Sequence, residues 1–328
     1  MVVHMSFKDL LALLADGEFH SGEELGQALG VSRAAVWKQL QKLAEVGLEL
    51  ESVKGRGYRL PGGFHPLDAS IISSHLDKSA AELLTSLDIS QQTESTSTDL
   101  GARARLGAGS GAVCVAEQQT VGRGRLGRQW LSSYGRNLMF SALWEFEGGA
   151  AALEGLSLAV GLVLAEALCE MGVAEVQLKW PNDVLCRGRK VAGILLEMQG
   201  DAAGHCQVVI GVGVNVAMPD NAAIDQAWTD LNRETGSNVD RNALLAQILG
   251  RLLPMLNHFA DVGFSAYRER WQSLDFLCDR AVILHRGEQK TEGVCRGVAS
   301  SGALKFEGAD GLELISGGEV SVRAAHDS

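Results

Sequence analysis

The sequence lacks paired cysteines, because its six cysteines are scattered over 328 residues and none stands in a C-x-x-C pair. Such scattering argues against a metal cluster and against a disulfide framework, and it suits a reducing compartment. The chain also lacks an excess of basic charge, since its formal net charge is −11. This charge argues against a protein coated in nucleic acid, so any DNA contact has to come from a local basic patch.

Two further absences concern location. The amino terminus has no signal peptide, because the acidic residues Asp9, Asp16 and Glu18 flank only a short apolar run. The longest apolar run, around residues 156–165, is far below membrane-spanning length. We therefore expect a cytoplasmic protein without a membrane partner. A length of 328 residues with 46% apolar residues predicts two or three domains with real cores.

The first sixty residues predict a winged helix-turn-helix. Ser21 and Glu24 form a capping box, and Ser32 caps the following helix, in which Val36 and Leu40 share one face. A turn around Gly55 then separates two short strands, which form the wing. The expected elements are three helices and a two-stranded wing, over residues 6–15, 21–30, 32–45 and 48–60.

The charge of this region favours DNA binding. Between residues 31 and 60 six basic side chains stand against three acidic ones, which reverses the trend of the whole chain. A small helical module for protein docking is the alternative, since winged helices also serve that purpose. Residues 61–66 then read as a linker. The side chains expected to contact DNA are Ser32, Arg33, Trp37, Lys38, Lys42, Lys54 and Arg56.

The stretch from Gly122 to Trp130 combines three glycines with three arginines before the tryptophan. Glycine lets a backbone approach a ligand closely, and arginine carries a permanent charge matched to carboxylate and phosphate. The stretch satisfies G-x-G-x-x-G, but a dinucleotide site would need a helix after Gly127, and residues 138–146 predict a strand instead. A nicotinamide-binding protein and a disordered RNA-binding tail are therefore disfavoured. An anion-binding loop between two strands is expected.

Four other polar features of the central block stand out, and the first three of them each allow two interpretations. The hydroxyl-rich residues 91–99 form either a strand end and helix cap or a surface for a polar ligand. Lys190, before an apolar strand over residues 190–198, is either a solvated strand end or a fixed ammonium beside a cleft. Asn215 is either satisfied in the core or in contact with a ligand. Asp183 ends a turn over residues 181–183 that points out of the sheet.

The remaining periodicity predicts an α+β protein with a β-rich tail. Glycines in the strand over residues 208–216 leave room for something flat to lie against it. Short strands separated by glycine turns after residue 275 suggest a small SH3-like barrel. Helices are expected over residues 68–72, 78–87, 153–171, 242–259 and 266–274, and tail strands over 281–284, 291–298, 303–306, 312–315 and 319–323.

Four motifs together resemble the bacterial bifunctional biotin–protein ligases that also repress the biotin operon. They are Gly-Arg-Gly-Arg-Leu-Gly-Arg (122–128), Lys-Trp-Pro-Asn-Asp-Val (179–184), Lys-Val-Ala-Gly-Ile-Leu-Leu-Glu (190–197) and Gly-Val-Gly-Val-Asn (211–215). The resemblance covers the whole chain, and the joint occurrence is specific although each motif alone is weak. It implies a winged helix over residues 1–61, a mixed-sheet catalytic domain over 67–274 and an SH3-like domain over 275–328.

The resemblance also implies a reaction. Biotin's carboxylate attacks the α-phosphate of ATP, and a lysine of the biotin carboxyl carrier protein of acetyl-CoA carboxylase then attacks the resulting biotinyl-5′-adenylate. Both reactants of the first step are anions, so fixed cations and Mg²⁺ are needed more than a covalent nucleophile. The adenylate-bound protein is expected to dimerise and to bind the operator DNA of biotin genes. The alternatives are a lipoate–protein ligase with a regulatory domain and a biotin-sensing repressor without ligase activity.

The resemblance assigns site residues by motif. Arg123, Arg125 and Lys190 are the implied catalytic cations, and Asp183 is a possible Mg²⁺ ligand. The family commonly has Ser-Thr-Asn where this chain has Ser97 in third place, which puts the role of that residue in doubt. The implied biotin contacts are Ser95, Thr96, Ser97, Gln119, Arg123, Gly124, Arg125, Lys190 and Gly193. The implied contacts with ATP or the adenylate are Arg123, Arg125, Arg128, Trp130, Asn182, Asp183, Asn215 and Arg323.

Overall fold

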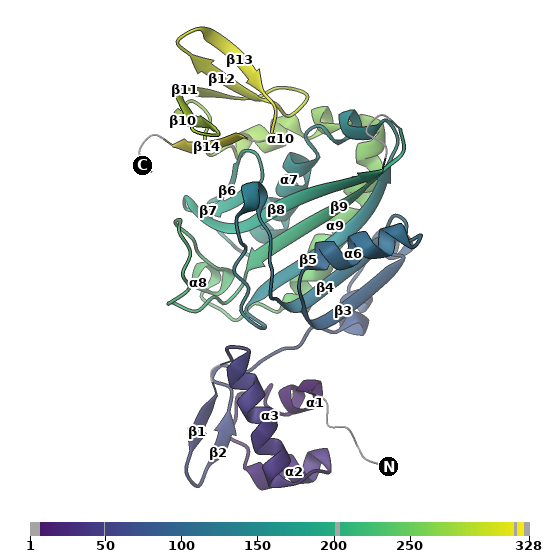
Figure 1. Ribbon diagram of the computed structural model, residues 1–328, viewed down its shortest axis with the longest axis vertical. Coiled ribbons are helices and arrows are strands. Elements are labelled where there is room, and N and C mark those ends of the chain that lie inside the picture. Colours follow the sequence, from purple (N-terminus) through teal and green to yellow (C-terminus); the bar gives the residue numbers. More distant parts are fainter. Residues whose placement is uncertain (1–6, 49, 201–203, 318–319, 325–328) are drawn as a thin grey trace.

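Three folded units follow one another in the computed structural model (Figure 1). The structure describes residues 7–48, 50–200, 204–317 and 320–324. The small N-terminal unit and the C-terminal sheet lie at opposite ends of the larger central unit (Figure 1). The predicted α+β organisation is therefore confirmed.

The N-terminal unit is the predicted winged helix-turn-helix. Ser21 and Glu24 form the capping box, because each side chain accepts a hydrogen bond from the backbone N–H of the other. Ser32 caps the next helix, and the predicted Val36 and Leu40 face is fully buried. The elements are α1 (Phe7–Leu13), α2 (Gly22–Leu29), α3 (Arg33–Glu45), β1 (Glu51–Val53) and β2 (Gly57–Arg59).

The predicted linker over residues 61–66 is irregular, but it is anchored to the central unit. Phe64 is buried and its ring centroid lies 6.0 Å from that of Tyr134, which belongs to the central unit. Both aromatic residues join the hydrophobic cluster of the winged helix. Gly135 makes this contact possible, because a Cβ atom there would lie 2.0 Å from the Phe64 ring. This aromatic pair is therefore one of the contacts that pack the first unit and its linker against the second.

The central unit is built on a seven-stranded mixed sheet. Strands β3 and β4 are parallel, and the other neighbouring strands pair antiparallel. Across the sheet the strands are β3 (Ser86–Thr93), β4 (Ala112–Gln119), β5 (Asn137–Phe146), β9 (Cys206–Asn215), β8 (Arg189–Gly200), β7 (Asp183–Cys186) and β6 (Val176–Lys179).

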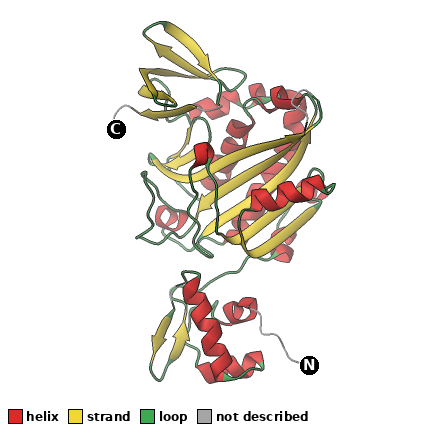
Figure 2. Ribbon diagram, viewed as in Figure 1, coloured by secondary structure: helices red, strands yellow, loops and turns green. Residues whose placement is uncertain are grey.

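Helices cover both faces of this sheet (Figure 2). Leu100 and Ala104 of α6 pack on one face, and α7 and α9 pack on the other, where they form the main core. The helices are α4 (Ala69–Ser74), α5 (Lys78–Leu83), α6 (Thr96–Arg105), α7 (Leu156–Glu170), α8 (Leu231–Thr235), α9 (Arg241–Val262) and α10 (Arg268–Ser273). Three short 3-10 turns are η1 (Arg125–Gly127), η2 (Gly149–Leu153) and η3 (Phe264–Ala266).

One apolar segment is longer than the sequence indicated. Because η2 leads into α7, residues Gly149–Glu170 form 22 consecutive residues that are long and apolar enough to cross a membrane by length and composition. In the structure α7 packs between the sheet and α9, and most of its residues are buried. Its apolar surface is therefore accounted for by the core.

Two predicted boundaries are wrong. The helix expected over residues 78–87 ends at Leu83, and β3 begins at Ser86, because Leu87 and Ile89 pair with the buried strand β4. The turn expected over residues 181–183 is shorter, since Asp183 already pairs with Lys179 in the β6–β7 hairpin. In the first place long-range strand pairing overrides the local signal, and in the second the pairing of a tight hairpin does so.

The C-terminal unit is a five-stranded antiparallel sheet, which confirms the predicted β-rich tail. Its predicted strands agree with the structure to within two residues at each end. The order is β13 (Gly311–Ile315), β12 (Leu304–Gly308), β11 (Gln289–Val298), β10 (Ala281–Arg286) and β14 (Val320–Ala324). Trp180 ties this sheet to the central unit, because its indole N–H donates to the carbonyl of Gly302 at 3.0 Å.

Candidate functional site

A cavity of about 710 Å³ brings the four sequence motifs together. It lies on the α6 face of the central sheet, where the start of α6 meets β9: a Cβ atom on Gly211 would lie 2.7 Å from the Ser97 hydroxyl. Its walls come from the Gly-Arg loop, the β6–β7 hairpin, β8, β9 and β14. All of the residues predicted to bind biotin or ATP line this cavity.

The Gly-Arg loop, residues 122–130, is a narrow hairpin. The backbone N–H of Trp130 donates to Gly122 at 2.9 Å, and that of Gly124 donates to Arg128 at 2.7 Å. The tip turns at Leu126 and Gly127, whose φ angles are 57° and 71°. Strand β5 follows, and the described residues between Gly127 and β5 form no helix. The prediction of a loop between strands is confirmed, and a dinucleotide-binding helix is absent here.

Trp130 lies flat on two glycines of the sheet. A Cβ atom on Gly193 would lie 2.9 Å from its ring, and one on Gly213 would lie 2.6 Å from it. The room that the strand glycines were expected to leave is therefore filled by a side chain of the protein itself. The indole Nε1 is buried and has no hydrogen-bond partner within the described part of the chain. It is a buried donor of a residue that lines the cavity.

Lys190 is a fixed ammonium rather than a solvated strand end. Its Nζ lies 2.7 Å from Asp183 Oδ1 and 5.3 Å from the Trp130 ring centroid, and its side chain is 16% exposed. Asp183 Oδ1 is buried and accepts no hydrogen bond of normal geometry from the described residues, so its contact with Lys190 is mainly electrostatic. Because Asp183 starts β7 opposite Gly193, the β7–β8 pairing fixes the pair in the cavity.

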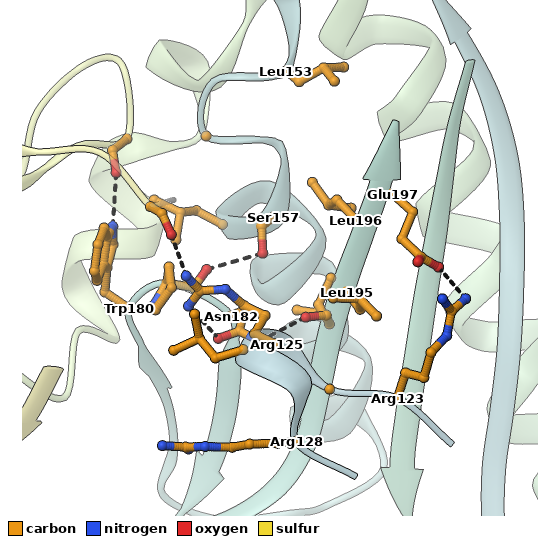
Figure 3. Close-up of a pocket in the computed structure, with 18 of the residues that line it drawn as sticks. Arg123, Arg125, Arg128, Leu153, Ser157, Trp180, Asn182, Leu195, Leu196 and Glu197 are labelled. Atoms are coloured by element: carbon orange, nitrogen blue, oxygen red, sulfur yellow. Dashed lines mark hydrogen bonds and ion pairs between the residues drawn. The ribbon is translucent and has the colours of Figure 1, made fainter. Parts of the chain in front are cut away.

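Two arginines of the Gly-Arg loop are engaged by protein acceptors (Figure 3). Arg123 Nη2 lies 2.8 Å from Glu197 Oε2 and 3.2 Å from the Thr98 hydroxyl. Arg125 donates to the carbonyls of Gly317 and Val320 in the C-terminal unit, the latter at 3.2 Å. Burial lowers the pKa of Arg125 from its ordinary value. The two arginines therefore line the cavity while acceptors of the protein hold their guanidinium groups.

A hydroxyl cluster lies at the start of α6, where Ser95, Thr96 and Ser97 line the cavity. Gln119 Oε1 accepts hydrogen bonds from both the backbone N–H and the hydroxyl of Thr96, at 2.7 and 2.9 Å. Ser141 lies within hydrogen-bond distance of the Thr96 and Ser97 hydroxyls, at 2.8 and 3.0 Å. Ser95 is the N-cap residue of α6, but its side chain makes no capping bond. The hydroxyl-rich segment is thus both a helix start and a cavity wall.

Asn215 is satisfied inside the protein, although it lines the cavity. Its Oδ1 accepts from Asn137 Nδ2 at 3.3 Å, and its Nδ2 donates to the carbonyl of Thr229 at 3.1 Å. Contact with adenine would compete with these bonds. Its ligand role remains a prediction, as does that of Arg323, which reaches the cavity from β14.

Sequence reasoning missed the loop over residues 223–228, which forms a further wall and ends in Trp228. The backbone of Lys190 donates to Ala227 at 3.0 Å and accepts from Thr229 at 2.9 Å, so this loop is tied to the proposed catalytic lysine. The one local signal was Asp230, which caps the short helix α8. The loop residues themselves carry no periodic pattern.

Asp183 is the only acidic residue among those predicted to contact ATP. The described residues contain no group of three His, Cys, Asp or Glu side chains that could hold a metal ion. The described residues therefore offer no complete set of protein ligands for a metal ion. Mg²⁺ that is bound through substrate phosphates needs only one or two carboxylates. Asp183 fits that lesser requirement, since it lies in the cavity.

The predicted DNA-binding side chains all lie on the surface of the winged helix. All seven residues, Ser32, Arg33, Trp37, Lys38, Lys42, Lys54 and Arg56, are exposed. Trp37 is 52% exposed, which is unusual for a tryptophan. Arg56 is also held by the protein, because its guanidinium lies 4.1 Å from the Phe19 ring centroid. The surface has the charge and exposure that a DNA contact requires.

Three family models match successive parts of the chain. Residues 7–59 match an HTH domain, residues 89–215 the biotin/lipoate A/B protein ligase family, and residues 277–323 the biotin protein ligase C-terminal domain.

Known proteins are similar over most of the chain. The bifunctional ligase/repressor BirA of Salmonella typhimurium is 43% identical over 96% of this chain and 97% of that protein. The biotin–[acetyl-CoA-carboxylase] ligase of Paracoccus denitrificans is 36% identical over 65% of this chain and 91% of that protein. A solved structure of the Aquifex aeolicus biotin protein ligase in complex with biotin and ATP is 32% identical, with a TM-score of 0.65, over 74% of this chain and all of that one.

Proposed function

The chain belongs to the family of bifunctional biotin ligases and repressors, and from that premise we propose how its residues carry out both activities. It is a biotin–protein ligase that consumes ATP, and its winged helix-turn-helix is the DNA-binding domain of a repressor. One observation supports the ligase activity most directly: a single cavity is lined by all four motifs, including Lys190, and by the hydroxyl-rich start of α6.

The first step joins two anions. Biotin's carboxylate attacks the α-phosphorus of ATP, pyrophosphate leaves, and biotinyl-5′-adenylate forms. Lys190 is suited to hold the negative charge that builds up, because it is a fixed cation with 16% of its side chain exposed. Arg125 would exchange the carbonyls of Gly317 and Val320 for ligand oxygens, and Arg123 would do the same with Glu197. When bound to the phosphates, Mg²⁺ would neutralise their charge, with Asp183 as its one protein ligand.

The second step transfers the biotinyl group. The amine of a lysine on the carrier protein attacks the carbonyl carbon of the adenylate, an amide forms, and AMP and a proton leave. The adenylate has to be kept from water until then. The Gly-Arg loop is placed for this purpose, because Trp130 already covers the cavity floor over Gly193 and Gly213.

The hydroxyl cluster is suited to the polar ring of biotin. Thr96 presents a hydroxyl group and Gln119 an amide, and both line the cavity. Ser97 is shorter than the asparagine common in the family, and Ser141 already occupies its hydroxyl at 3.0 Å. We therefore assign the Ser97 hydroxyl to its hydrogen bond with the buried Ser141 rather than to direct binding.

Two rival functions are separated by one assay. Purified protein is mixed with ATP, a carrier domain and either biotin or lipoate, and pyrophosphate release and label transfer are followed. A biotin ligase releases pyrophosphate and labels the carrier with biotin only. Transfer of lipoate at a comparable rate would favour a lipoate–protein ligase. Binding of biotin without pyrophosphate release would favour a sensor without ligase activity.

An open strand edge supports the proposed partners. Strand β7 covers β8 only as far as Gly193, and in the described residues no strand pairs with β8 on that side from Leu195 to Gly200. A second cavity of about 700 Å³ runs along this edge (Figure 3). We propose that both a second copy of the chain and the carrier protein pair with it, so that they compete. The dimer would form in the cytoplasm when adenylate is bound.

Sedimentation tests this competition. With biotin and ATP present, the protein should sediment as a dimer and bind operator DNA more tightly, and unbiotinylated carrier domain should return it to a monomer. The variant Met198→Lys places a charge on the open edge, where Met198 is 40% exposed. It should weaken the binding of both partners. An unchanged oligomeric state on adding biotin and ATP would contradict the proposal.

A further inference from the structure

A third cavity, of about 510 Å³, lies in the winged helix-turn-helix, where α3 meets the wing strand β2. The described residues that line it are Gly22 of α2, Arg33, Ala34, Val36 and Trp37 of α3, and Tyr58 of β2. Only one of these side chains is charged, and it is basic. The cavity therefore combines two aromatic rings with a single cation that no acidic lining residue neutralises.

Arg33 and Tyr58 converge on the backbone of Gly22. A Cβ atom on Gly22 would lie 3.4 Å from Arg33 Cγ and 3.6 Å from Tyr58 Cε2. The ion pairs of the winged helix join His20 to Asp16 and Arg59 to Glu51, so within the described residues none of them involves Arg33. Its guanidinium charge is thus available to an anion from outside the chain.

The position of Tyr58 is fixed by backbone hydrogen bonds on both of its sides. On one side it pairs with Ser52 of β1. On the other side its N–H and carbonyl each form a 2.9 Å hydrogen bond with His20, which lies just before α2. Gly57 permits this approach, because a Cβ atom there would lie 2.1 Å from the His20 carbonyl oxygen. The fold itself therefore sets the distance between the wing and α2.

The shape and charge of the cavity suit the sugar–phosphate backbone of DNA. A phosphate is matched by the forked guanidinium of Arg33, and a tyrosine hydroxyl can donate to a phosphate oxygen. The apolar face of a deoxyribose is matched by an aromatic ring, and Trp37 offers one that is 52% exposed. The surroundings are basic as well, because the Phe19 ring holds the guanidinium groups of Arg56 and Arg59 at 4.1 and 4.6 Å.

We propose that this cavity holds one backbone phosphate of operator DNA together with its deoxyribose. Arg33 and the Tyr58 hydroxyl bind the phosphate, and Trp37 packs against the sugar. The inference rests on the proposed function only in taking the winged helix to bind DNA. It adds Tyr58 to the predicted DNA surface and assigns Trp37 to the backbone instead of a base edge. Such contacts position a protein on the duplex without reading its sequence.

A scan of operator DNA with single methylphosphonates tests the phosphate contact, because each substitution removes the charge of one phosphate. Full-length protein is used with biotin and ATP. At one position or more the substitution should weaken binding by the wild type at least about tenfold. At the same position it should weaken binding by Arg33→Gln less than about twofold, since the phosphate has already lost its partner.

Lys78→Gln is the matched control for this scan, because Lys78 is a 91% exposed lysine of the central unit. It should show the wild-type pattern at every phosphate. An Arg33→Gln pattern that equals the wild-type pattern at every phosphate would overturn the proposal. Failure of the wild type itself to bind operator DNA would instead refute the repressor function, and the inference with it.

Binding to operator DNA and to an unrelated duplex tests the assignment of the two aromatic residues. Tyr58→Phe keeps the ring and should weaken binding to both duplexes about three- to tenfold, since one hydrogen bond is lost. Trp37→Ala should also weaken both, and the ratio of the two affinities should stay within about twofold of the wild type. Unchanged binding by Tyr58→Phe would remove its hydroxyl from the site. A loss confined to operator DNA in Trp37→Ala would show that Trp37 reads a base, which contradicts the proposal.

Discussion

The buried ion pair between Arg241 and Glu117 gives the sharpest prediction about stability. The side chains are 4% and 0% exposed, and Arg241 Nη1 lies 2.6 Å from Glu117 Oε2. The same guanidinium donates to the carbonyls of Asn137 and His65, and Glu117 Oε1 accepts from the backbone N–H of Leu67 at 2.7 Å. The pair therefore joins the start of α9 to the sheet and to the linker of the winged helix.

Replacing Arg241 by methionine keeps most of the side-chain volume but leaves the buried carboxylate of Glu117 without its cation. Glu117 Oε2 accepts no hydrogen bond of normal geometry from the described residues, so the Arg241 guanidinium is the main group that stabilises its charge. Removing one partner of a buried pair costs about 3–5 kcal/mol, and two backbone carbonyls lose a donor as well. Arg251→Met on the same helix is the matched control. Its partner Glu170 is 54% exposed, so we expect a loss of at most about 1 kcal/mol there.

Urea unfolding of the two variants measures the difference in the free energy of unfolding. The double variant Arg241→Met with Glu117→Leu should recover at least half of the loss, because no charge is left without a partner. A loss in Arg241→Met no larger than that in Arg251→Met would refute the reasoning. It would mean that water reaches Glu117 in the folded state.

Three further predictions concern separate parts of the chain. Gly213→Ala places a Cβ atom 2.6 Å from the Trp130 ring, so the ring has to move and biotin transfer should fall at least about tenfold. Gly250→Ala is the control and should transfer biotin like the wild type, because its Cβ atom meets nothing within 4 Å. Equal activities of the two variants would contradict the placement of Trp130 on Gly213. Burial raises the pKa of Asp275 to about 6, so the folded state gives up its proton less readily than the unfolded chain and stability falls as the pH rises from about 4 to 6. Asp275→Asn should remove that part of the decline in Tm, and an unaltered decline would exclude Asp275 as its source. Lys38→Ala should lower the salt dependence of operator binding by about one unit of slope, and an unchanged slope would remove Lys38 from the DNA surface.

Local signals predicted the winged helix well. The capping box at Ser21 and Glu24 and the buried face of Val36 and Leu40 depend on neighbours within one or two turns, and the structure has both. The absence of a helix after Gly127 was likewise visible, because the following residues read as turn and strand. These features need no information from distant parts of the chain.

Features that depend on distant contacts were not predictable. The floor of the cavity is Trp130 on Gly193 and Gly213, and no pattern within the Gly-Arg loop indicates where its tryptophan lies. The cavity wall that ends in Trp228 is positioned by contacts with Arg233 on α8 and with the backbone of Lys190 on β8. Neither contact is visible in the residues of the wall itself. The predicted helix over residues 78–87 overlaps the start of β3 for the same reason, since the partner strand β4 decides the conformation there.

The central claim, that Lys190 is the cation of adenylate formation, is tested most directly by ATP-dependent transfer of labelled biotin to a carrier domain. Lys190→Ala should reduce adenylate formation at least about a hundredfold, since a developing oxyanion loses its fixed partner. Arg125→Gly should still form the adenylate but release it, so that lysines of bystander proteins become labelled. Lys290→Ala, an exposed lysine of the C-terminal sheet, is the control and should match the wild type. Adenylate formation by Lys190→Ala within twofold of that control would contradict the account.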